Sequence, residues 1–166
     1  MPDLMPALPP GYRAVPATAQ DVGSIRRLVS ACELEVYGRV RTDPGGVAAV
    51  FARPGLIPEL DTLLIHDQAG RLAARAWVNR RSEVDVHPQH RGRGLGAVLI
   101  DWAEARARQA GSEQIVQTVP DGDKGAVALL RSRGYAPMVT EWLLEFAIVR
   151  RACGARAARG HHGEAV

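Results

Sequence analysis

The sequence predicts an α/β fold of the α+β kind, in which helices cover a mixed central sheet. Three observations predict it. Segments with helical spacing of apolar residues alternate with short strand-like segments along the chain. Two strand-like segments flank the turn Asp67–Gly70, which indicates a hairpin. A third strand-like segment runs through Pro88 into a glycine-rich loop and then an amphipathic helix, which indicates a crossover connection.

The first elements are predicted from capping and breaking signals. A strand is expected at 12–16. Thr18 and Asp21 have the spacing of a capping box, so a helix should follow. Its apolar face consists of Val22, Ile25, Leu28, Val29 and Cys32. A short helix at 47–51 ends at Arg53-Pro54-Gly55.

The remaining elements surround the glycine-rich loop. The helix after the loop presents an apolar face formed by Leu95, Val98, Leu99 and Trp102. Gly134 is expected to cap the last helix. In chain order, the expected elements are strands at 62–66, 71–78 and 83–86, the helix after the loop, a strand at 115–119, a helix at 123–132 and a final strand region at 138–148.

Composition indicates a soluble globular protein of one domain. The chain has 166 residues, of which 46% are hydrophobic and 23% charged. No apolar run is long enough to cross a membrane, and the N-terminus has no secretion pattern, so a cytoplasmic protein is expected. Cys32 and Cys153 are distant from each other and are expected to be free thiols.

The positive charge lies at the C-terminus. The net charge is +3, and residues 150–166 hold four arginines against one glutamate, so residues 1–149 are balanced. A basic body would have indicated a nucleic-acid-binding protein, but only the tail is basic. The expected organisation is an extended, proline-rich segment at 1–11, one domain at 12–149 and a basic, disordered tail at 150–166.

The glycine-rich loop has the chemistry of an anion site. Gly92, Gly94 and Gly96 alternate with other residues after Arg91, and a helix follows at once. Glycines let the backbone approach an anion, and a helix N-terminus presents unpaired N–H groups. Arg91 and Arg93 could add contacts to phosphate oxygens. The alternative is a tight strand-to-helix turn that uses glycine only for its geometry.

Two common phosphate motifs are excluded. Gly94-Leu95-Gly96 lacks the Gly-Lys-Ser/Thr ending of a P-loop, and the spacing is Gly-x-Gly-x-Gly rather than Gly-x-Gly-x-x-Gly. The loop also follows a central strand rather than the first strand of a dinucleotide-binding unit.

Arg91-Gly92-Arg93-Gly94-Leu95-Gly96 resembles the Arg/Gln-x-x-Gly-x-Gly/Ala signature of the GNAT superfamily of N-acetyltransferases. The resemblance extends over about residues 12–148. It implies a GNAT fold with about six to seven strands and about four helices. It also implies acetyl-CoA as co-substrate, direct acetyl transfer to a primary amine in a ternary complex, and a homodimer. Arg53-Pro54-Gly55 and Asp61-Thr62-Leu63 resemble mycothiol synthase-type tandem acetyltransferases more weakly.

The resemblance assigns roles to matching positions. Val84 and Val86 lie on the strand that pairs with the pantetheine amides, and the Val86 N–H would point to the thioester carbonyl. The pyrophosphate loop consists of Arg91, Gly92, Arg93, Gly94, Leu95, Gly96 and Ala97. Asp123 stands where the family often has an asparagine at the start of the helix after the fifth strand.

Three departures concern proton transfer. Asp123 replaces that asparagine, Leu130 stands at the position of the usual general-acid tyrosine, and Thr118 replaces a carboxylate common on the fifth strand. Tyr135 follows the helix and is expected in the core. Two functions therefore stay open: an N-acetyltransferase, and a GNAT-like module that binds acyl-CoA without catalysis.

Glu83 and Asp85 share one face of the signature strand. One could be the general base, directly or through water; the alternative is a surface pair bridged to Arg81. His87 and His90 are too few ligands for a metal, so surface histidines and no metal are expected. The acceptor pocket should lie at 33–50 and 138–142, and neither stretch indicates which small-molecule or peptide amine is bound. No nucleic-acid or membrane partner is expected.

Overall fold

The computed structural model describes residues 4–79 and 81–140. The chain divides into two units between Tyr135 and Ala136. Residues 136–140 have no helix or strand. The first unit contains β1 (Arg13–Val15), α1 (Val22–Tyr37), α2 (Gly46–Phe51), α3 (Pro58–Asp61), β2 (Thr62–His66), β3 (Leu72–Val78), β4 (Ser82–Val86), α4 (Leu95–Gln109) and α5 (Lys124–Ser132).

The sheet has four strands in the order β1-β2-β3-β4, and all neighbours are antiparallel. The β3–β4 register places Arg75 opposite Asp85 and Trp77 opposite Glu83. Beyond β4, a single parallel bridge joins Ser82 to Gln117. Beyond this bridge no further strand pairs with β4 among the described residues, so the edge of β4 is open after its first residue.

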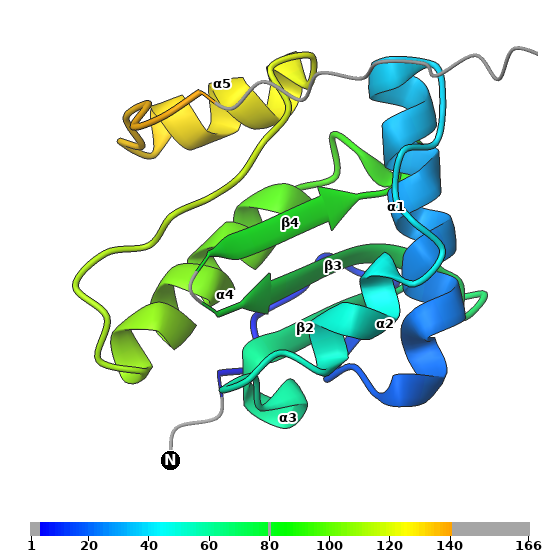
Figure 1. The fold of residues 1–166 in the computed structure, drawn as a ribbon, viewed down its shortest axis with the longest axis horizontal. Helices are drawn as coiled ribbons and strands as arrows, with labels where there is room; N and C mark the ends of the chain where they lie inside the picture. The colour runs from blue at the N-terminus through cyan, green and yellow to red at the C-terminus, as the bar shows by residue number, and fades with distance from the viewer. Residues whose placement is uncertain (1–3, 80, 141–166) are drawn as a thin grey trace, which may run out of the picture. The chain divides into compact units, whose positions relative to one another are not determined.

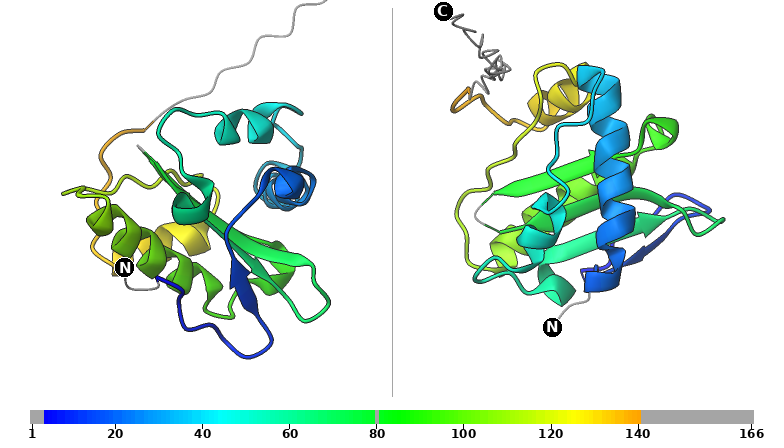
Figure 2. Two further views of the ribbon diagram at one scale, coloured as in Figure 1. Left: turned by 90° about the horizontal axis from the view of Figure 1, so that it is seen from below. Right: turned by 45° about the vertical axis from the view of Figure 1, so that its right-hand side comes forward.

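Helices cover both faces of the sheet (Figures 1 and 2). Successive side chains of a strand point to opposite faces of the sheet, so each face has its own hydrophobic core. On one face α4 packs Leu95, Leu99 and Trp102 against a cluster that includes Leu63 and Ile65. On the other face, α1 and α2 contribute apolar side chains that pack around Leu64 and Trp77, namely Ile25, Val29, Val47 and Val50.

Most predicted elements up to residue 110 are confirmed, including the two helices with their apolar faces and the β2–β3 hairpin. α5 is also confirmed, and Gly134 follows it with a φ of +84°. The helix α3 was not predicted. It is a single turn with Pro58 at its start. No helix in the described part of the chain is long and apolar enough to cross a bilayer.

The prediction for the far edge of the sheet is wrong at 115–119. There the backbone makes only the hydrogen bonds of one bridge, from Ser82 N–H to the Val116 carbonyl and from Thr118 N–H to the Ser82 carbonyl. The chain then leaves β4, so the described sheet has four antiparallel strands, and the expected mixed sheet of six to seven strands is not confirmed. Residues 138–140 are irregular, and the rest of the expected strand at 138–148 lies outside the described residues.

Candidate functional site

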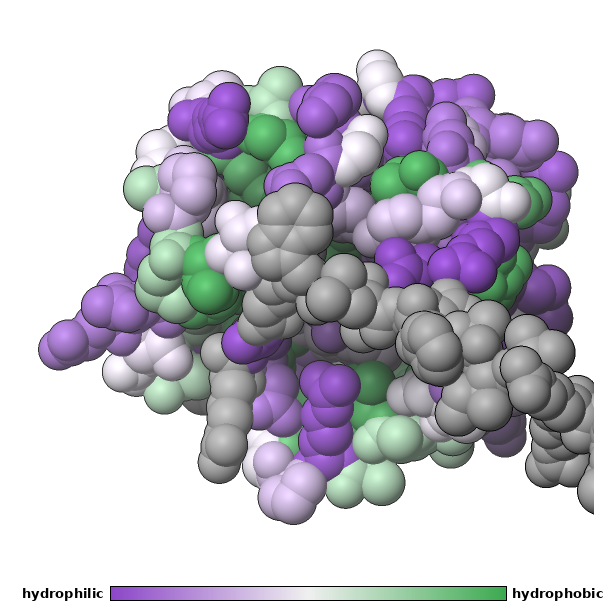
Figure 3. Space-filling view, turned by 45° about the horizontal axis from the view of Figure 1, so that its top comes forward, coloured by the Kyte–Doolittle hydropathy of each residue, from purple (hydrophilic) through white to green (hydrophobic). Residues whose placement is uncertain are grey.

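A pocket of about 980 Å³ opens beside β4. Its walls come from α1, α2, β3, β4, the glycine loop, the segment 117–120 and α5. Figure 3 brings the top of the view in Figure 1 forward, and hydrophilic and hydrophobic residues are interspersed on the visible part of that face. The pocket therefore contains most of the positions that the sequence singled out.

The open edge of β4 presents backbone groups to this pocket. His87 N–H donates to the Ala73 carbonyl of β3, whereas the N–H and carbonyl of Ser82 point the other way, to 116–118. Because backbone groups alternate sides along a strand, those of Val84 and Val86 also point away from β3. The Val86 carbonyl accepts from Cys32 Sγ and from Arg91 Nε, each at 3.4 Å. Val84 and Val86 thus offer N–H groups on the side where β4 has no neighbour.

The glycine loop adopts a conformation that favours glycine. Gly92 and Gly94 have φ values of +72° and +83°, and a Cβ added to either would meet nothing within 4 Å. Gly94 directly precedes α4, whose first N–H groups have no partner within the helix. The loop is therefore an exposed set of backbone donors at a positive helix end.

Gly96 allows a close packing. A Cβ there would lie 3.2 Å from Leu129 of α5 and 3.8 Å from Val86 of β4. Its bare backbone thus lets α4, α5 and β4 meet at the pocket.

Arg91 and Arg93 point to different sides of the loop. Arg91 forms ion pairs with Glu35 of α1 at 3.0 Å and with Asp123 at 3.1 Å. Arg93 donates to the Tyr12 hydroxyl at 3.1 Å and lines a second, smaller cavity instead of the main pocket. Arg91 therefore ties the loop to α1 and to the start of α5.

Glu83 and Asp85 lie in the pocket, and Arg75 of β3 bridges them. Its Nη2 lies 2.5 Å from Asp85 and 3.3 Å from Glu83. The expected partner was Arg81; the register explains the difference, because Arg75 stands opposite Asp85. Arg75 is 4% exposed, and its guanidinium carbon lies 3.8 Å from the centroid of the Trp77 ring.

The start of α5 completes the pocket. Asp123 caps this helix, since its Oδ1 accepts from Ala126 N–H at 3.0 Å. Leu130, at the position of the usual tyrosine, lines the pocket and is 7% exposed. Thr118 also lines it. Tyr135 is half-buried; burial, with Glu104 beside it, raises the pKa of its hydroxyl to about 12.

Two further groups on α1 are held in place. Burial alone would raise the pKa of Glu33, but hydrogen bonds from the Thr42 hydroxyl and from the N–H groups of Thr42 and Arg41 outweigh it and lower that pKa. Burial, together with the charge of Asp85, raises the pKa of the Cys32 thiol to about 12. Cys32 is buried on the predicted apolar face of α1, where it also lines the pocket.

Behind the loop lies a cluster that the sequence did not indicate. Tyr12 shares a hydrogen bond with His90 Nδ1 at 2.9 Å, and His90 Nε2 lies 3.7 Å from Asp67. His90 is buried, so the expectation of a surface histidine is wrong there. Burial and the nearby Arg93 lower the pKa of His90. Among the described residues no group of three potential ligands could hold a metal ion.

Comparison with known proteins identifies the region. Residues 59–135 match the Acetyltransferase (GNAT) family. This stretch of the chain is a GNAT acetyltransferase domain. The GNAT match runs from Glu59 in α3 to Tyr135, three residues past the end of α5, so it contains β4, the glycine loop and Leu130. The sequence matches none of the curated proteins.

Solved structures share the GNAT fold. A GCN5-related N-acetyltransferase from Sphaerobacter thermophilus is 26% identical over 79% of this chain, with a TM-score of 0.70, and this chain covers 45% of its length. A Salmonella typhimurium protein described as an acetyltransferase, solved with its cofactor acetyl-CoA, is 21% identical (TM-score 0.60; 78% of this chain and 82% of that one). A phosphinothricin acetyltransferase from Sinorhizobium meliloti, in complex with acetyl-CoA, is 21% identical (TM-score 0.56; 75% and 74%).

Proposed function

We propose that this protein is an acetyl-CoA-dependent N-acetyltransferase that acetylates a primary amine by direct transfer in a ternary complex. One observation carries the proposal: within a GNAT domain, an open strand edge and a glycine loop at a helix N-terminus line the same pocket. Solved structures with the same fold include two with acetyl-CoA.

The residues present fit this co-substrate. The pyrophosphate would lie against the backbone N–H groups of 92–97, where Gly92 and Gly94 leave open space for it. The pantetheine amides would pair with the outward groups of Val84 and Val86. Arg91 and Asp123 would act as positioning residues, because they bind each other rather than face the open loop.

Acetyl-CoA, when bound, supplies an activated acetyl group as a thioester. The Val86 N–H would donate to the carbonyl of that thioester. The acceptor amine must lose a proton, and Glu83 or Asp85 could take it directly or through water, since both line the pocket. Leu130 has no proton to give, so the departing thiolate would take its proton from water, which a thiol's acidity tolerates.

A second function is favoured by Leu130: a domain that binds acyl-CoA without transferring the acetyl group. The apolar side chain fills the position where the family's tyrosine would donate a proton, and it is buried. This function requires the same loop and strand edge, so binding alone does not separate the two.

A turnover assay distinguishes the N-acetyltransferase from the acyl-CoA-binding module. Release of free thiol from acetyl-CoA is measured with a panel of primary amines, for the wild type and for Gly94→Trp, whose indole would occupy the open space at the loop. An N-acetyltransferase releases thiol only with particular amines and loses this activity in the variant. Tight acetyl-CoA binding with no turnover on any amine would favour the binding module. The homodimer and the domain limits at 12 and 149 remain predictions.

A further inference from the structure

The part of the pocket beside β3 and β4 has an uneven charge distribution. Glu83 and Asp85 share a single guanidinium, that of Arg75, so this cluster has a net charge of minus one. Arg75 is buried against Trp77 and fixes both carboxylates toward the pocket. The cluster is therefore a rigid, negatively charged wall.

The other pocket carboxylates are also held by hydrogen bonds or an ion pair, but on α1 and at the start of α5 rather than on the sheet. Arg91 pairs with both Glu35 and Asp123. Glu33 accepts hydrogen bonds from Thr42 and from the backbone of Arg41. Carboxylates therefore outnumber their paired guanidinium groups throughout the described pocket, and on the sheet this excess lies at Glu83 and Asp85.

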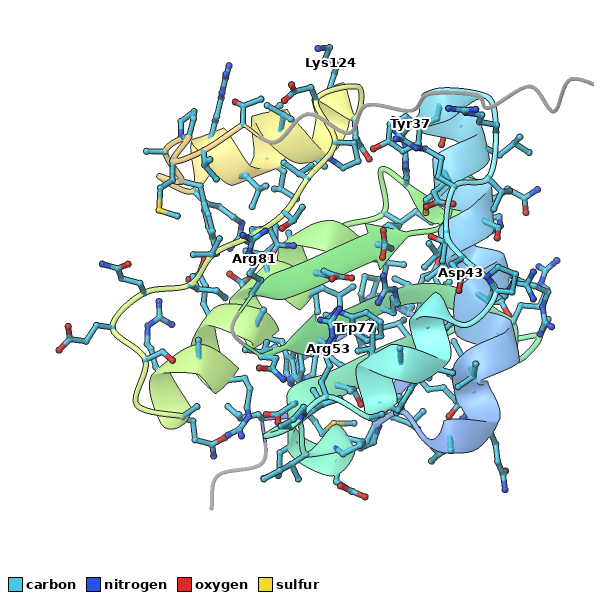
Figure 4. The ribbon with its side chains drawn as sticks, in the orientation of Figure 1. Tyr37, Asp43, Arg53, Trp77, Arg81 and Lys124 are labelled. Atoms are coloured by element: carbon cyan, nitrogen blue, oxygen red, sulfur yellow. The ribbon has the colours of Figure 1, made fainter. Side chains whose placement is uncertain are left out.

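One arginine that lines the same pocket has no partner for its charge among the described residues. Arg53 follows α2, its side chain is exposed, and no described residue makes a hydrogen bond or ion pair with its guanidinium. Figure 4 shows Arg53 and Trp77 over the same part of the sheet. Lys124 also lines the pocket, but in Figure 4 it extends outward from the start of α5. Arg53 is thus a pocket cation that Figure 4 places over the part of the sheet that carries Trp77, whose ring lies against Arg75.

We propose that the acceptor is an amine that carries an acid group on the same molecule, as an amino acid does. Its ammonium group binds at Glu83 and Asp85, where two carboxylates exceed one guanidinium, and its acid group binds Arg53. A neutral amine would leave the guanidinium of Arg53 without a counterion, and a simple acid would face the negative cluster. This inference rests on the proposed N-acetyltransferase function and names its substrate class.

The test compares acceptors that differ only in the acid group. Amino acids, their carboxamides and the matching aminophosphonates are assayed with acetyl-CoA, using the wild type, Arg53→Ala and Arg53→Lys. Arg26→Ala is the matched control, because Arg26 is an exposed arginine of α1 outside the pocket. The wild type should prefer the acid over its amide by roughly tenfold in kcat/KM, the effect of one hydrogen bond to a charged group.

Arg53→Ala should bring the acid-to-amide ratio close to one, mainly through KM for the acid. Arg53→Lys should retain part of the preference, and Arg26→Ala all of it. Equal turnover of acids and amides by the wild type would overturn the inference while leaving the N-acetyltransferase intact.

Absence of turnover on every amine would overturn the proposed function instead. The inference is then decided by calorimetric titration of the same acids and amides into the protein saturated with coenzyme A. Preferential binding of the acid, lost in Arg53→Ala, supports it; equal binding or none refutes it.

Discussion

Replacing Gly94 with alanine is expected to weaken acetyl-CoA binding at the loop more than its small cost in thermal stability would explain. Gly94 has a φ of +83° and open space around its Cβ position, so alanine meets no clash but adopts a left-handed conformation. That conformation costs roughly 1–2 kcal/mol. For a chain of this size the melting temperature should fall by about 2–8 °C. The methyl group would also stand where the pyrophosphate is proposed to approach the backbone.

Gly111 provides the matched control. Its φ is +78°, its Cβ position is equally open, and it follows the far end of α4. Both alanine variants should lose similar stability in thermal unfolding. Only Gly94→Ala should weaken acetyl-CoA binding in calorimetry, by about tenfold or more, which corresponds to about 1.4 kcal/mol. Equal affinity of the two variants for acetyl-CoA would refute the assignment of the loop.

Three further predictions concern stability and reactivity. Asp61→Ala leaves Arg106 buried without the carboxylate that its Nε contacts at 2.7 Å, and should cost about 3–5 kcal/mol in chemical denaturation; a loss below 1 kcal/mol would contradict a buried pair. Because the folded protein has a lowered pKa at Glu33, the ionised carboxylate adds to the free energy of unfolding above the unfolded-state pKa of about 4.3. This contribution is lost as the pH falls through the folded-state pKa. Thermal unfolding should therefore show Glu33→Gln less stable than wild type at pH 7, with the difference shrinking below about pH 4; a constant difference would exclude this. In a Cys153→Ser background, Cys32, with its pKa raised to about 12, should resist alkylation at pH 8 until the protein unfolds; rapid labelling of the native protein would show that the thiol is not buried.

The features predicted best from the sequence are those determined by local signals. The apolar face of α1, the turn Asp67–Gly70 and the alternating glycines after Arg91 each specify their own backbone conformation, and the structure has each as expected. These signals are sufficient to place the loop and the strand before it.

The partners of the site residues depend on register and on long-range packing. Arg75 lies within an apolar strand, and only the β3–β4 register, in which the two numbers of each pair add to a constant, places it opposite Asp85. The contact between Tyr12 and His90 spans 78 positions, and no local pattern indicates it.

The segment 115–119 shows that residue types typical of a strand do not by themselves determine whether the segment pairs with a sheet. Its residues are typical of a strand, yet only Gln117 bridges to Ser82 before the chain diverges from β4. The divergence opens the edge of Val84 and Val86, and the segment then lines the pocket. Pairing along its full length would have filled the proposed binding edge.

Amide hydrogen exchange with and without acetyl-CoA tests the central claim most directly. Bound acetyl-CoA should slow exchange in peptides that cover Val84–Val86 and the loop at 92–97, and Gly94→Trp should abolish both effects. The β2–β3 hairpin turn at Asp67–Gly70 should be unaffected and serves as the internal reference. Binding of acetyl-CoA that leaves exchange at the loop and at β4 unchanged would contradict the account.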